Sequence, residues 1–364
     1  MHNGKLYLVT GGAGFIGSCF VLAQVKGGRA SVVTLDKLTY SGNLHNLDGL
    51  ENPQETPARH TFVHGDIGDA ELVARLLREH QPDAIINFAA ETHVDRSIAD
   101  PAPFVQSNVA ALCTLLGTTL EWWKSLDPDK AAAFRFLHIS TDEVFGTLKR
   151  GDPAFTEQTP YAPNSPYSAS KAASDHFARA FYETYGLPVI ITNCSNNYGP
   201  RQFPEKLIPL AIVNALAGRP IPIYGSGENI RDWLYVEDHC SALELALERG
   251  RPGLTYNIGG KSEKNNLEVI HTLCSLLDEA RPAPALGPKG YTSLIAHVKD
   301  RPGHDFRYAI NCGKIERELG WSPALSFEDG LRRTLNWYLE NGAWLESVQS
   351  GEYRRWLEHN YQNR

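Results

Sequence analysis

Short apolar runs rich in β-branched residues alternate with longer amphipathic segments through the first half of the chain. Runs of that kind favour strands, whereas apolar positions spaced three and four apart favour helices. The alternation is typical of βαβ units, in which a parallel sheet lies between two layers of helices and the crossovers are right-handed. The pattern predicts strands near 5–10, 31–35, 61–64, 83–88, 134–140 and 188–193, and helices near 15–26, 69–80, 101–124 and 166–185.

The pattern changes after Gly199, where prolines become frequent and the apolar runs become shorter and more widely spaced. We expect a smaller, mostly C-terminal lobe there, attached to a doubly wound, Rossmann-type α/β domain. The periodic stretch Val236–Leu247 and the apolar run Tyr256–Ile258 are candidates to return to the first sheet. The predicted division is a large domain over 1–198, with returning segments near 233–262 and 305–325, and a lobe formed by 199–232, 263–304 and 326–364.

Composition and charge narrow the possible functions. With 364 residues, of which 42% are hydrophobic and 21% charged, the chain can form one large domain with an added lobe, or two domains. A net charge of −7, with basic residues interspersed among acidic ones, argues against binding to the backbone of nucleic acids. The chain has neither an apolar run long enough to span a membrane nor a secretion signal, so we expect a cytoplasmic protein. The six cysteines are far apart, which predicts reduced thiols and neither a disulfide framework nor a metal site.

A glycine-rich turn, G-G-A-G-F-I-G from Gly11 to Gly17, follows the first predicted strand. Glycines in such a turn let backbone N–H groups approach a pyrophosphate, which the dipole of the following helix also favours. Asp36, at the end of the second strand, can accept hydrogen bonds from a ribose and would repel a 2′-phosphate, so NAD is the predicted cofactor. Lys37 leaves NADP open, and a plain turn is the alternative for the glycines alone. Asp66, after the third strand, is either an adenine contact or a turn and helix cap.

A tyrosine and a lysine share one face of the helix predicted over 166–185. Tyr167 and Lys171 are four residues apart, which places their Cβ atoms about 5–6 Å from each other. An ammonium group and an oxidised nicotinamide both stabilise a phenolate, so Tyr167 can take the proton of a sugar hydroxyl while NAD accepts hydride. Such a pair also arises by chance on amphipathic helices. Combined with the glycine turn, Asp36 and the alternating units, however, it resembles the extended short-chain dehydrogenase/reductase family, in which a Y-x-x-x-K pair performs this oxidation.

Two carboxyl residues, Asp142 and Glu143, follow the fifth predicted strand. Ligands bind at the carboxyl ends of parallel strands, so both are expected at the same site. Oxidation needs only a hydroxyl such as that of Thr141. Elimination of water, in contrast, needs a base for the acidified C–H and a protonated acid for the departing hydroxide. A turn cap at Asp142 and a solvated Glu143 are the alternative from position alone.

Five motifs together resemble one branch of this family, the dTDP-glucose 4,6-dehydratases, over nearly the whole chain: S-T-D-E-V-F-G, Y-S-A-S-K, N-C-S-N-N-Y-G-P, R-D-W-L-Y-V-E-D-H and D-R-P-G-H. The resemblance implies that Tyr167 deprotonates the hydroxyl on sugar carbon 4, assisted by Thr141 and Lys171. It implies that Glu143 removes the carbon-5 proton and that Asp142 protonates the departing carbon-6 hydroxyl. Tightly bound NAD would be recycled in each turnover, and dTDP-glucose would become dTDP-4-keto-6-deoxyglucose for 6-deoxysugar nucleotides such as dTDP-L-rhamnose.

The resemblance also implies which residues contact the ligands. Cofactor contacts are implied at Gly11, Gly14, Phe15, Ile16, Gly17, Asp36, Lys37, Leu38, Thr39, Asp66, Ile67, Ala89, Ala90, Glu91, Ser107, Tyr167, Lys171, Cys194 and Asn197. Substrate contacts are implied at His93, Thr141, Asn196, Lys206, Leu207, Pro222, Ile223, Tyr224, Arg231, Asn266, Asp300, Arg301, Pro302, Gly303 and His304. Arg231 is the strongest of these on chemical grounds, because a guanidinium matches diphosphate oxygens in bidentate geometry.

Structural roles are the alternatives for several of these residues. His93 is also readable as a core histidine, Arg231 as a surface partner of Glu228, and Arg301 with His304 as part of a solvated loop. The stretch 146–156 is shorter than the loop that follows the acid/base strand in many relatives, which leaves closure of the pocket there open.

Two other functions stay open from the sequence. A sugar-nucleotide 4-epimerase would share Tyr167 and Lys171 but has no need of Asp142 and Glu143. A non-catalytic NAD-binding sensor would not need Asp142, Glu143 and Tyr167 together at one site. The resemblance implies a homodimer through the helices at 101–124 and 166–185, with Trp122 and Trp123 as possible contributors.

Overall fold

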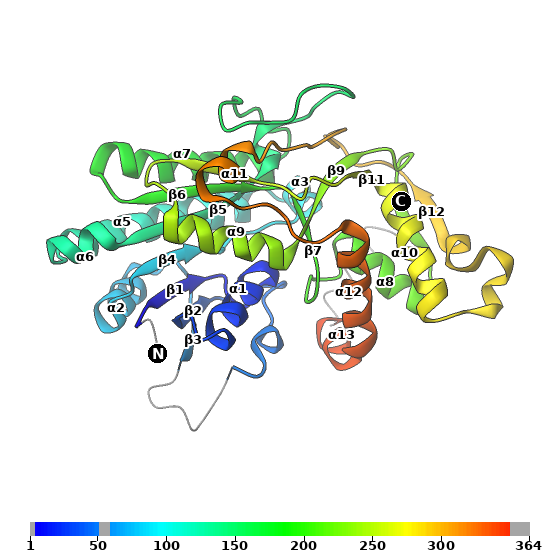
Figure 1. Cartoon of the computed structure of the whole chain (residues 1–364), viewed down its shortest axis with the longest axis horizontal. Coiled ribbons are helices and arrows are strands. Elements are labelled where there is room, and N and C mark those ends of the chain that lie inside the picture. Colours follow the sequence, from blue (N-terminus) through cyan, green and yellow to red (C-terminus); the bar gives the residue numbers. More distant parts are fainter. Residues whose placement is uncertain (1–3, 51–58, 350–364) are drawn as a thin grey trace.

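The computed structural model describes residues 4–50 and 59–349 (Figure 1). Within these residues, seven strands form the main sheet in the order β10-β6-β5-β4-β1-β2-β3, and all neighbouring strands are parallel. The chain leaves β1 towards β2 and β3, then crosses to β4 on the other side, so the predicted doubly wound sheet is confirmed. The strands are β1 (Leu6–Thr10), β2 (Ser31–Asp36), β3 (His60–His64), β4 (Ala84–Asn87), β5 (Arg135–Thr141), β6 (Val189–Cys194) and β10 (Thr255–Ile258).

Side chains along the strands alternate between two helical layers. On β1, Val9 packs against the helices of one layer and Leu8 against those of the other. On β4, Ile86 lies on the same face as Val9, and Ile85 lies on the same face as Leu8. Both faces of the sheet are therefore apolar, which explains the nearly continuous apolar runs of its strands. One layer contains α1 (Phe15–Lys26), α9 (Val236–Arg249) and α11 (Gly313–Leu319), and the other contains α2 (Ala70–His80), α5 (Ala111–Lys124) and α7 (Pro166–Tyr185).

Segments from the second half of the chain join this assembly. β10 extends the sheet beyond β6, and α9 packs against α1. The stretches Val236–Leu247 and Tyr256–Ile258 thus lie with the main sheet, as their apolar patterns predict.

A second group of helices and strands lies beside the main sheet (Figure 1), and its side chains form a second, separate apolar cluster. Its helices are α8 (Leu207–Leu216), α10 (Asn266–Ala280), α12 (Phe327–Glu340) and α13 (Gly342–Val348). Its strands form two small sheets, β11 (Glu263–Asn265) with β9 (Ile230–Tyr235) and β7 (Asn196–Tyr198), and β12 (Ile295–Val298) with β8 (Ile221–Tyr224). The boundaries of the predicted lobe stay a prediction, and residues 350–364 of its last segment lie outside the described residues.

The helix predicted over 101–124 contains a widened turn. Between α4 (Ala102–Phe104) and α5, residues Val105–Ala110 form a π-helix, η2. Asn108 in this turn is buried, accepts from Glu91 N at 2.8 Å, and donates to Glu91 O at 3.0 Å and to Ser170 Oγ at 2.9 Å. These partners lie outside the helix, so the helical periodicity of the sequence gives no sign of the π turn.

Several short elements complete the described chain. The segment 146–156 is held by backbone bonds to 305–311, since Leu148 N donates to Arg307 O at 3.0 Å and Phe155 N to Ala309 O at 2.8 Å. No helix in the described part of the chain is both long and apolar enough to cross a bilayer. The remaining elements are α3 (Val94–Ala99), α6 (Pro128–Ala133), η1 (Leu44–Leu47), η3 (Asp142–Phe145) and η4 (Pro284–Leu294).

Candidate active site

A pocket lies at the carboxyl ends of β1, β2, β4, β5 and β6, bordered on its other side by residues 202–206. Most of the predicted cofactor and catalytic residues come together in its wall. They are Gly11, Gly14, Phe15, Ile16, Gly17, Asp36, Lys37, Thr39, Asp66, Ile67, Ala89, Ala90, Glu91, Ser107, Thr141, Glu143, Tyr167, Lys171, Cys194 and Asn197. Leu38 and Asp142 are not part of the wall, and each is adjacent to a residue that is.

Gly11 and Gly17 of the glycine turn have no space for a side chain. Gly11 has a φ of +69°, and a Cβ there would lie 2.6 Å from Ala89 N. A Cβ at Gly17 would lie 2.3 Å from Gly11 O. Gly14 is the N-cap of α1, so the first turn of the helix opens into the pocket and fits the diphosphate of a dinucleotide.

Asp36 connects the glycine turn with the loop after β2. Its Oδ2 accepts from Ala13 N at 2.9 Å and its Oδ1 from Leu38 N at 2.8 Å. Burial raises the pKa of the carboxyl, and these two backbone donors act in the opposite direction. The carboxylate is thus fixed at the end of β2, where a ribose contact was predicted.

Lys37 is already engaged within the protein. Its Nζ lies 3.2 Å from Asp66 Oδ2 and donates to Ser107 Oγ at 2.9 Å. Asp66 Oδ1 also accepts from Gly68 N at 2.8 Å, so Asp66 forms a turn and lines the pocket at once. With two partners of its own, the ammonium of Lys37 is a weak candidate to receive a 2′-phosphate.

Tyr167 and Lys171 lie in the first turns of α7, which Ser165 caps with Pro166 as the first helical residue. Lys171 Nζ donates to Ile139 O at 2.8 Å. Burial raises the pKa of the Tyr167 phenol well above its usual value, Glu143 and Cys194 raise it further, and a hydrogen bond with Thr141 lowers it. The phenol is therefore protonated in the protein alone, and it needs added positive charge, such as that of an oxidised nicotinamide, to serve as a base.

Asp142 is buried behind the pocket wall, in the first position of η3. Thr141 Oγ1 caps this turn by accepting from Glu143 N at 3.3 Å, so neither carboxyl serves as the cap. Asp142 is 1% exposed, and its Oδ2 has no hydrogen-bond partner among the described residues. Burial raises its pKa well above the usual value, Glu143 and Asp232 add to the rise, and Arg231 opposes it. This environment favours the protonated acid.

Glu143 lines the pocket and has a more cationic environment. Burial also raises the pKa of this carboxyl, but Arg301, Lys206 and Arg231 all act to lower it. The two adjacent carboxyls therefore differ in the way that acid/base chemistry requires, with Asp142 the more readily protonated and Glu143 the more readily ionised.

Cys194 ends β6 beside the same wall. Its Sγ donates to Ser140 O at 3.3 Å and lies 3.4 Å from Asn197 Nδ2. Burial raises the pKa of this thiol, so it stays protonated. All six cysteines are free, as their spacing predicts.

The predicted substrate residues divide into two groups. Thr141, Asn196 and Lys206 line the pocket, and Lys206 Nζ donates to Thr92 O at 2.8 Å. The side chain of Ile223 is buried in the second apolar cluster, so a ligand contact there would come from its backbone. The residues outside the wall are His93, Leu207, Pro222, Ile223, Tyr224, Arg231, Asn266, Asp300, Arg301, Pro302, Gly303 and His304.

Long-range contacts join several members of this second group. Tyr224 OH donates to Asp95 Oδ2 at 2.8 Å, and Arg301 Nη1 lies 3.8 Å from Asp95 Oδ1. The Tyr224 ring meets His304 edge to face at 6.1 Å, and His304 Nδ1 lies 2.6 Å from Asp300 Oδ1. Arg301 and His304 thus belong to a connected cluster, which the solvated-loop alternative does not describe.

Arg231 and His93 are both buried. Arg231 donates to Asp305 O at 3.0 Å and stacks over the Tyr308 ring at 4.3 Å, so it is not the surface partner of Glu228 that the alternative describes. His93 Nδ1 accepts from Arg96 N at 3.3 Å at the start of α3, and burial lowers the pKa of the ring well below its usual value. A neutral structural histidine at position 93 therefore fits its contacts.

The sequence interpretation missed several residues at this site. Glu205 is buried in the pocket wall and accepts from Tyr40 OH at 3.0 Å. Burial raises the pKa of Glu205 to about 7, although Lys206 and Arg96 act to lower it. The pair Glu205-Lys206 directly after a glycine- and proline-rich motif was a usable signal. Nothing local in the sequence indicates Tyr308, which reaches the site from a distant segment.

Comparison with known proteins places this geometry in a family. The family model described as GDP-mannose 4,6 dehydratase matches residues 8–334. The chain belongs to this family. A relative named dTDP-glucose 4,6-dehydratase from Xanthomonas campestris pv. campestris (strain B100) is 59% identical over 96% of this chain and 97% of the relative. The Escherichia coli (strain K12) protein named dTDP-glucose 4,6-dehydratase 1 is 53% identical over 98% of this chain and 99% of its own. The resemblance seen in the five motifs is confirmed by these relatives.

Solved structures agree with the sequence relatives. DesIV, a dTDP-glucose 4,6-dehydratase from Streptomyces venezuelae solved with NAD bound, is 47% identical with a TM-score of 0.84, covering 94% of this chain and 100% of its own. A UDP-glucose 4-epimerase from Thermus thermophilus, solved with NAD, is 28% identical with a TM-score of 0.79, covering 93% of this chain and 100% of its own. The fold is thus shared by proteins named for two different reactions, so the fold alone does not distinguish them.

Proposed function

We propose that this protein is an NAD-dependent hydro-lyase, a dTDP-glucose 4,6-dehydratase that forms dTDP-4-keto-6-deoxyglucose and water. The observation that carries the proposal is the adjacent pair Asp142 and Glu143 at the end of β5, of which Asp142 holds its proton more strongly, with Tyr167 lining the same pocket as Glu143. The names of relatives at 53% and 59% identity support the same substrate.

NAD fits the residues of the pocket. The turn from Gly11 to Gly17 would hold its diphosphate, Asp36 its adenosine ribose, and Lys171 the ribose beside the nicotinamide. Bound NAD supplies the acceptor for hydride from sugar carbon 4 and the donor that returns hydride to carbon 6. Because no net oxidation occurs, the protein gains from holding NAD tightly through the whole cycle.

The protein side chains move the protons. Tyr167 Oη takes the proton of the carbon-4 hydroxyl, and Thr141 Oγ1 is placed to hydrogen-bond the same oxygen. The resulting ketone acidifies the C–H at carbon 5, from which the Glu143 carboxylate removes the proton. Asp142 donates its proton to the hydroxyl that leaves carbon 6 as water. Burial raises the pKa of both carboxyls, but it raises that of Asp142 more strongly, whereas Arg301, Lys206 and Arg231 oppose the rise at Glu143, so Asp142 is the better acid of the two and Glu143 the better base.

The second group of helices and strands supplies the nucleotide half of the site in this proposal. Arg231 and Lys206 would neutralise the diphosphate, and 300–304 would close over it. Among the described residues, we assign 199–232, 263–304 and 326–349 to this substrate lobe and the others to the NAD-binding domain. The product would supply 6-deoxysugar nucleotides such as dTDP-L-rhamnose in the cytoplasm.

A homodimer through α5 and α7 is part of the proposal. Large apolar side chains are exposed along η2 and α7, with Val105 56%, Phe177 42% and Tyr185 50% exposed. Trp122 is a correction to the sequence-based expectation, because it packs in the core against Phe134 at 5.3 Å between ring centres. Sedimentation of the wild type and of F177E would test this surface, and a wild-type monomer would exclude the dimer.

Product analysis tests the reaction. Incubation with dTDP-glucose should give a 4-keto-6-deoxy product whose mass is lower by one water, while GDP-mannose and CDP-glucose should react far more slowly. An isomer of unchanged mass would instead support the epimerase function, and binding of NAD without turnover of any of the three sugars would support a sensor.

Replacing Asp142 by Asn separates the steps. The amide cannot deliver a proton to the leaving hydroxide, so overall turnover should fall by about 10²–10⁴-fold. Tyr167 and Lys171 are unchanged, so enzyme-bound NADH should still form and should persist. Equal loss of NADH formation and of product would contradict the role of Asp142 as the acid.

A further inference from the structure

A row of polar side chains crosses the otherwise apolar face of the main sheet that α7 covers. Thr10, Asn87 and His138 stand side by side on β1, β4 and β5, and Ser140 stands beside Asn193 on β5 and β6. Thr10 Oγ1 donates to Asn87 Oδ1 at 2.6 Å, and Asn87 Nδ2 donates to His138 Nδ1 at 3.1 Å. Since His138 Nδ1 accepts, its Nε2 carries the hydrogen.

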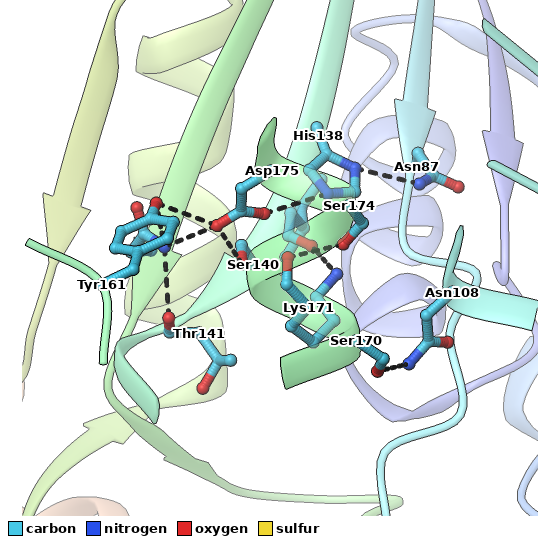
Figure 2. Close-up of polar contacts among 12 residues, drawn as sticks. Asn87, Asn108, His138, Ser140, Thr141, Tyr161, Ser170, Lys171, Ser174 and Asp175 are labelled. Carbon is cyan, nitrogen blue, oxygen red and sulfur yellow. Dashed lines mark hydrogen bonds and ion pairs between the residues drawn. The ribbon is translucent and has the colours of Figure 1, made fainter. Parts of the chain in front are cut away.

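His138 and Ser140 of this row point towards Asp175 of α7 (Figure 2). Its Oδ2 accepts from Ser140 Oγ at 2.8 Å, from Tyr161 OH at 3.0 Å and from Asn193 Nδ2 at 3.2 Å. His138 Nε2 lies 3.2 Å from Asp175 Oδ1. Asp175 is 2% exposed, and the four groups that face its oxygens are all donors, which fits a carboxylate and not an acid.

Asp175 is connected in two ways to residues of the proposed reaction. It follows Lys171 by one helical turn, and Lys171 is itself 4% exposed with its Nζ bonded to a neutral carbonyl, Ile139 O. The same Asn193 amide that donates to Asp175 also donates to Thr141 O at 3.1 Å. The mechanism assigns no role to Asp175, yet a buried carboxylate with this many partners is costly to maintain without one.

We propose that Asp175 is a positioning residue whose carboxylate provides the buried counter-charge that keeps Lys171 an ammonium, and whose partners fix the strand end that carries Thr141. The inference rests on the proposed function, because it is through Lys171 and Thr141 that Asp175 would affect the reaction.

The charges around Lys171 support this assignment. Burial lowers the pKa of Lys171, while Asp175 on α7 and Cys194 on β6 act to raise it. Cys194 is a protonated thiol, and burial together with the Lys171 charge lowers the pKa of His138 on β5, so neither carries charge at neutral pH. Tyr167 on α7 is protonated in the protein alone, and Asp142 and Glu143 of η3 act on Tyr167. Asp175 is therefore the anion that balances the ammonium.

Asp175→Asn tests the charge while keeping the size of the side chain. Without the carboxylate, Lys171 should lose its proton at a pH lower by about one unit or more, as expected for removing one nearby charge from a buried site. The direct measurement is the NMR titration of Lys171 with ¹³C at lysine Cε, assigned with K171M. In the turnover of dTDP-glucose, the alkaline limb of the pH profile of kcat should move down by a similar amount, with NAD content unchanged.

Matched variants separate charge from packing. Asp175→Glu keeps the charge and should retain the wild-type titration of Lys171, whereas Tyr161→Phe removes one donor without changing charge and should leave the alkaline limb in place. Asp175→Ser is a second neutral variant in case D175N does not fold. An unchanged Lys171 midpoint in a folded neutral variant would overturn the inference even if the dehydratase assay succeeds. A wild type that does not convert dTDP-glucose would overturn the proposed function, and the NMR titration would still decide whether Asp175 controls Lys171.

Discussion

The proposed cofactor end of the site, at Gly11–Gly17 and Asp36, and the proposed nucleotide end, at Tyr224, Asp95 and Arg301, are built in different ways. At the cofactor end, a strand, a glycine turn and a helix are continuous within residues 6–26, backbone atoms crowd Gly11 and Gly17, and Asp36 is fixed by two backbone amides. At the nucleotide end, Tyr224, Asp95 and Arg301 meet through side chains from three distant segments.

This difference determines how each end responds to change. A turn packed through its main-chain atoms cannot accommodate an added Cβ, because those atoms cannot move away. A cluster of side chains can re-form around a substitution, and it loses mainly the interaction that was removed. We therefore expect large, all-or-none effects at the cofactor end and graded effects at the nucleotide end.

Gly17→Ala should have the largest effect. The new Cβ would lie 2.3 Å from Gly11 O and 2.9 Å from Gly12 Cα, so the turn must open. We expect NAD affinity to fall by at least about 100-fold, or about 3 kcal/mol, together with a lower Tm. Gly342→Ala is the control, since a Cβ at that position meets nothing within 4 Å, and its Tm should change little. Normal NAD content in purified G17A would show that the turn is more adaptable than its geometry indicates.

The same difference explains what the sequence could predict. The strand positions and the helices over 15–26 and 166–185 were predicted closely, because burial on both faces of the sheet and the capping of α7 by Ser165 and Pro166 leave local patterns. The π turn at Val105–Ala110 was not predicted, because the partners of its buried Asn108, Glu91 and Ser170, lie outside the helix and leave no sign in its periodicity.

The candidate site follows the same rule. The glycine turn, Asp36 and the Tyr167–Lys171 spacing are recognisable within short windows, and the structure brings them to one pocket. The Asp175 cluster depends on neighbouring strands placing polar residues side by side, which a linear reading does not reveal. Its one local sign is that Asp175 follows Lys171 by the same four residues that separate Lys171 from Tyr167.

Burial of Asp142 should lower the folding stability of the protein at neutral and higher pH. The pKa of Asp142 is raised in the folded state, so its contribution to stability is fully present below the unfolded value of about 4 and declines as pH rises towards the folded value. Asp142→Asn removes the ionisation, and at pH 8 we expect it to be more stable than the wild type by about 1–3 kcal/mol. Denaturant unfolding at several pH values measures this, and the difference between the proteins should shrink towards pH 4. If D142N were destabilised equally at pH 4 and pH 8, burial of Asp142 would not lower the stability of the wild type at high pH.

Arg301→Gln should give a graded effect at the nucleotide end. Loss of one guanidinium contact should raise KM for dTDP-glucose by about tenfold, with NAD content unchanged. Arg301 also acts to lower the pKa of Glu143, so the acidic limb of kcat/KM should move to higher pH in R301Q. Arg301→Lys keeps the charge and should return the acidic limb of kcat/KM to its wild-type pH. KM for dTDP-glucose should stay raised, because lysine lacks the planar guanidinium that binds two oxygens at once. A complete loss of bound NAD in R301Q would remove the proposed distinction between the two ends.

Trp344→Phe should have the smallest effect, and it tests the contact between the second apolar cluster and the cofactor end. Trp344 Nε1 of α13 donates to Asn46 Oδ1 at 2.7 Å, and Asn46 Nδ2 donates to Ala13 O at 2.8 Å in the glycine turn. Phenylalanine keeps the aromatic packing but leaves the buried Asn46 oxygen unpaired, at a cost of about 1 kcal/mol, so NAD should bind about fivefold more weakly. Trp337→Phe, in the neighbouring ring that lies 5.0 Å from Trp344, is the matched control and should leave NAD affinity unchanged. Equal NAD affinity in W344F and the wild type would mean that the cofactor end holds its shape without help from α13.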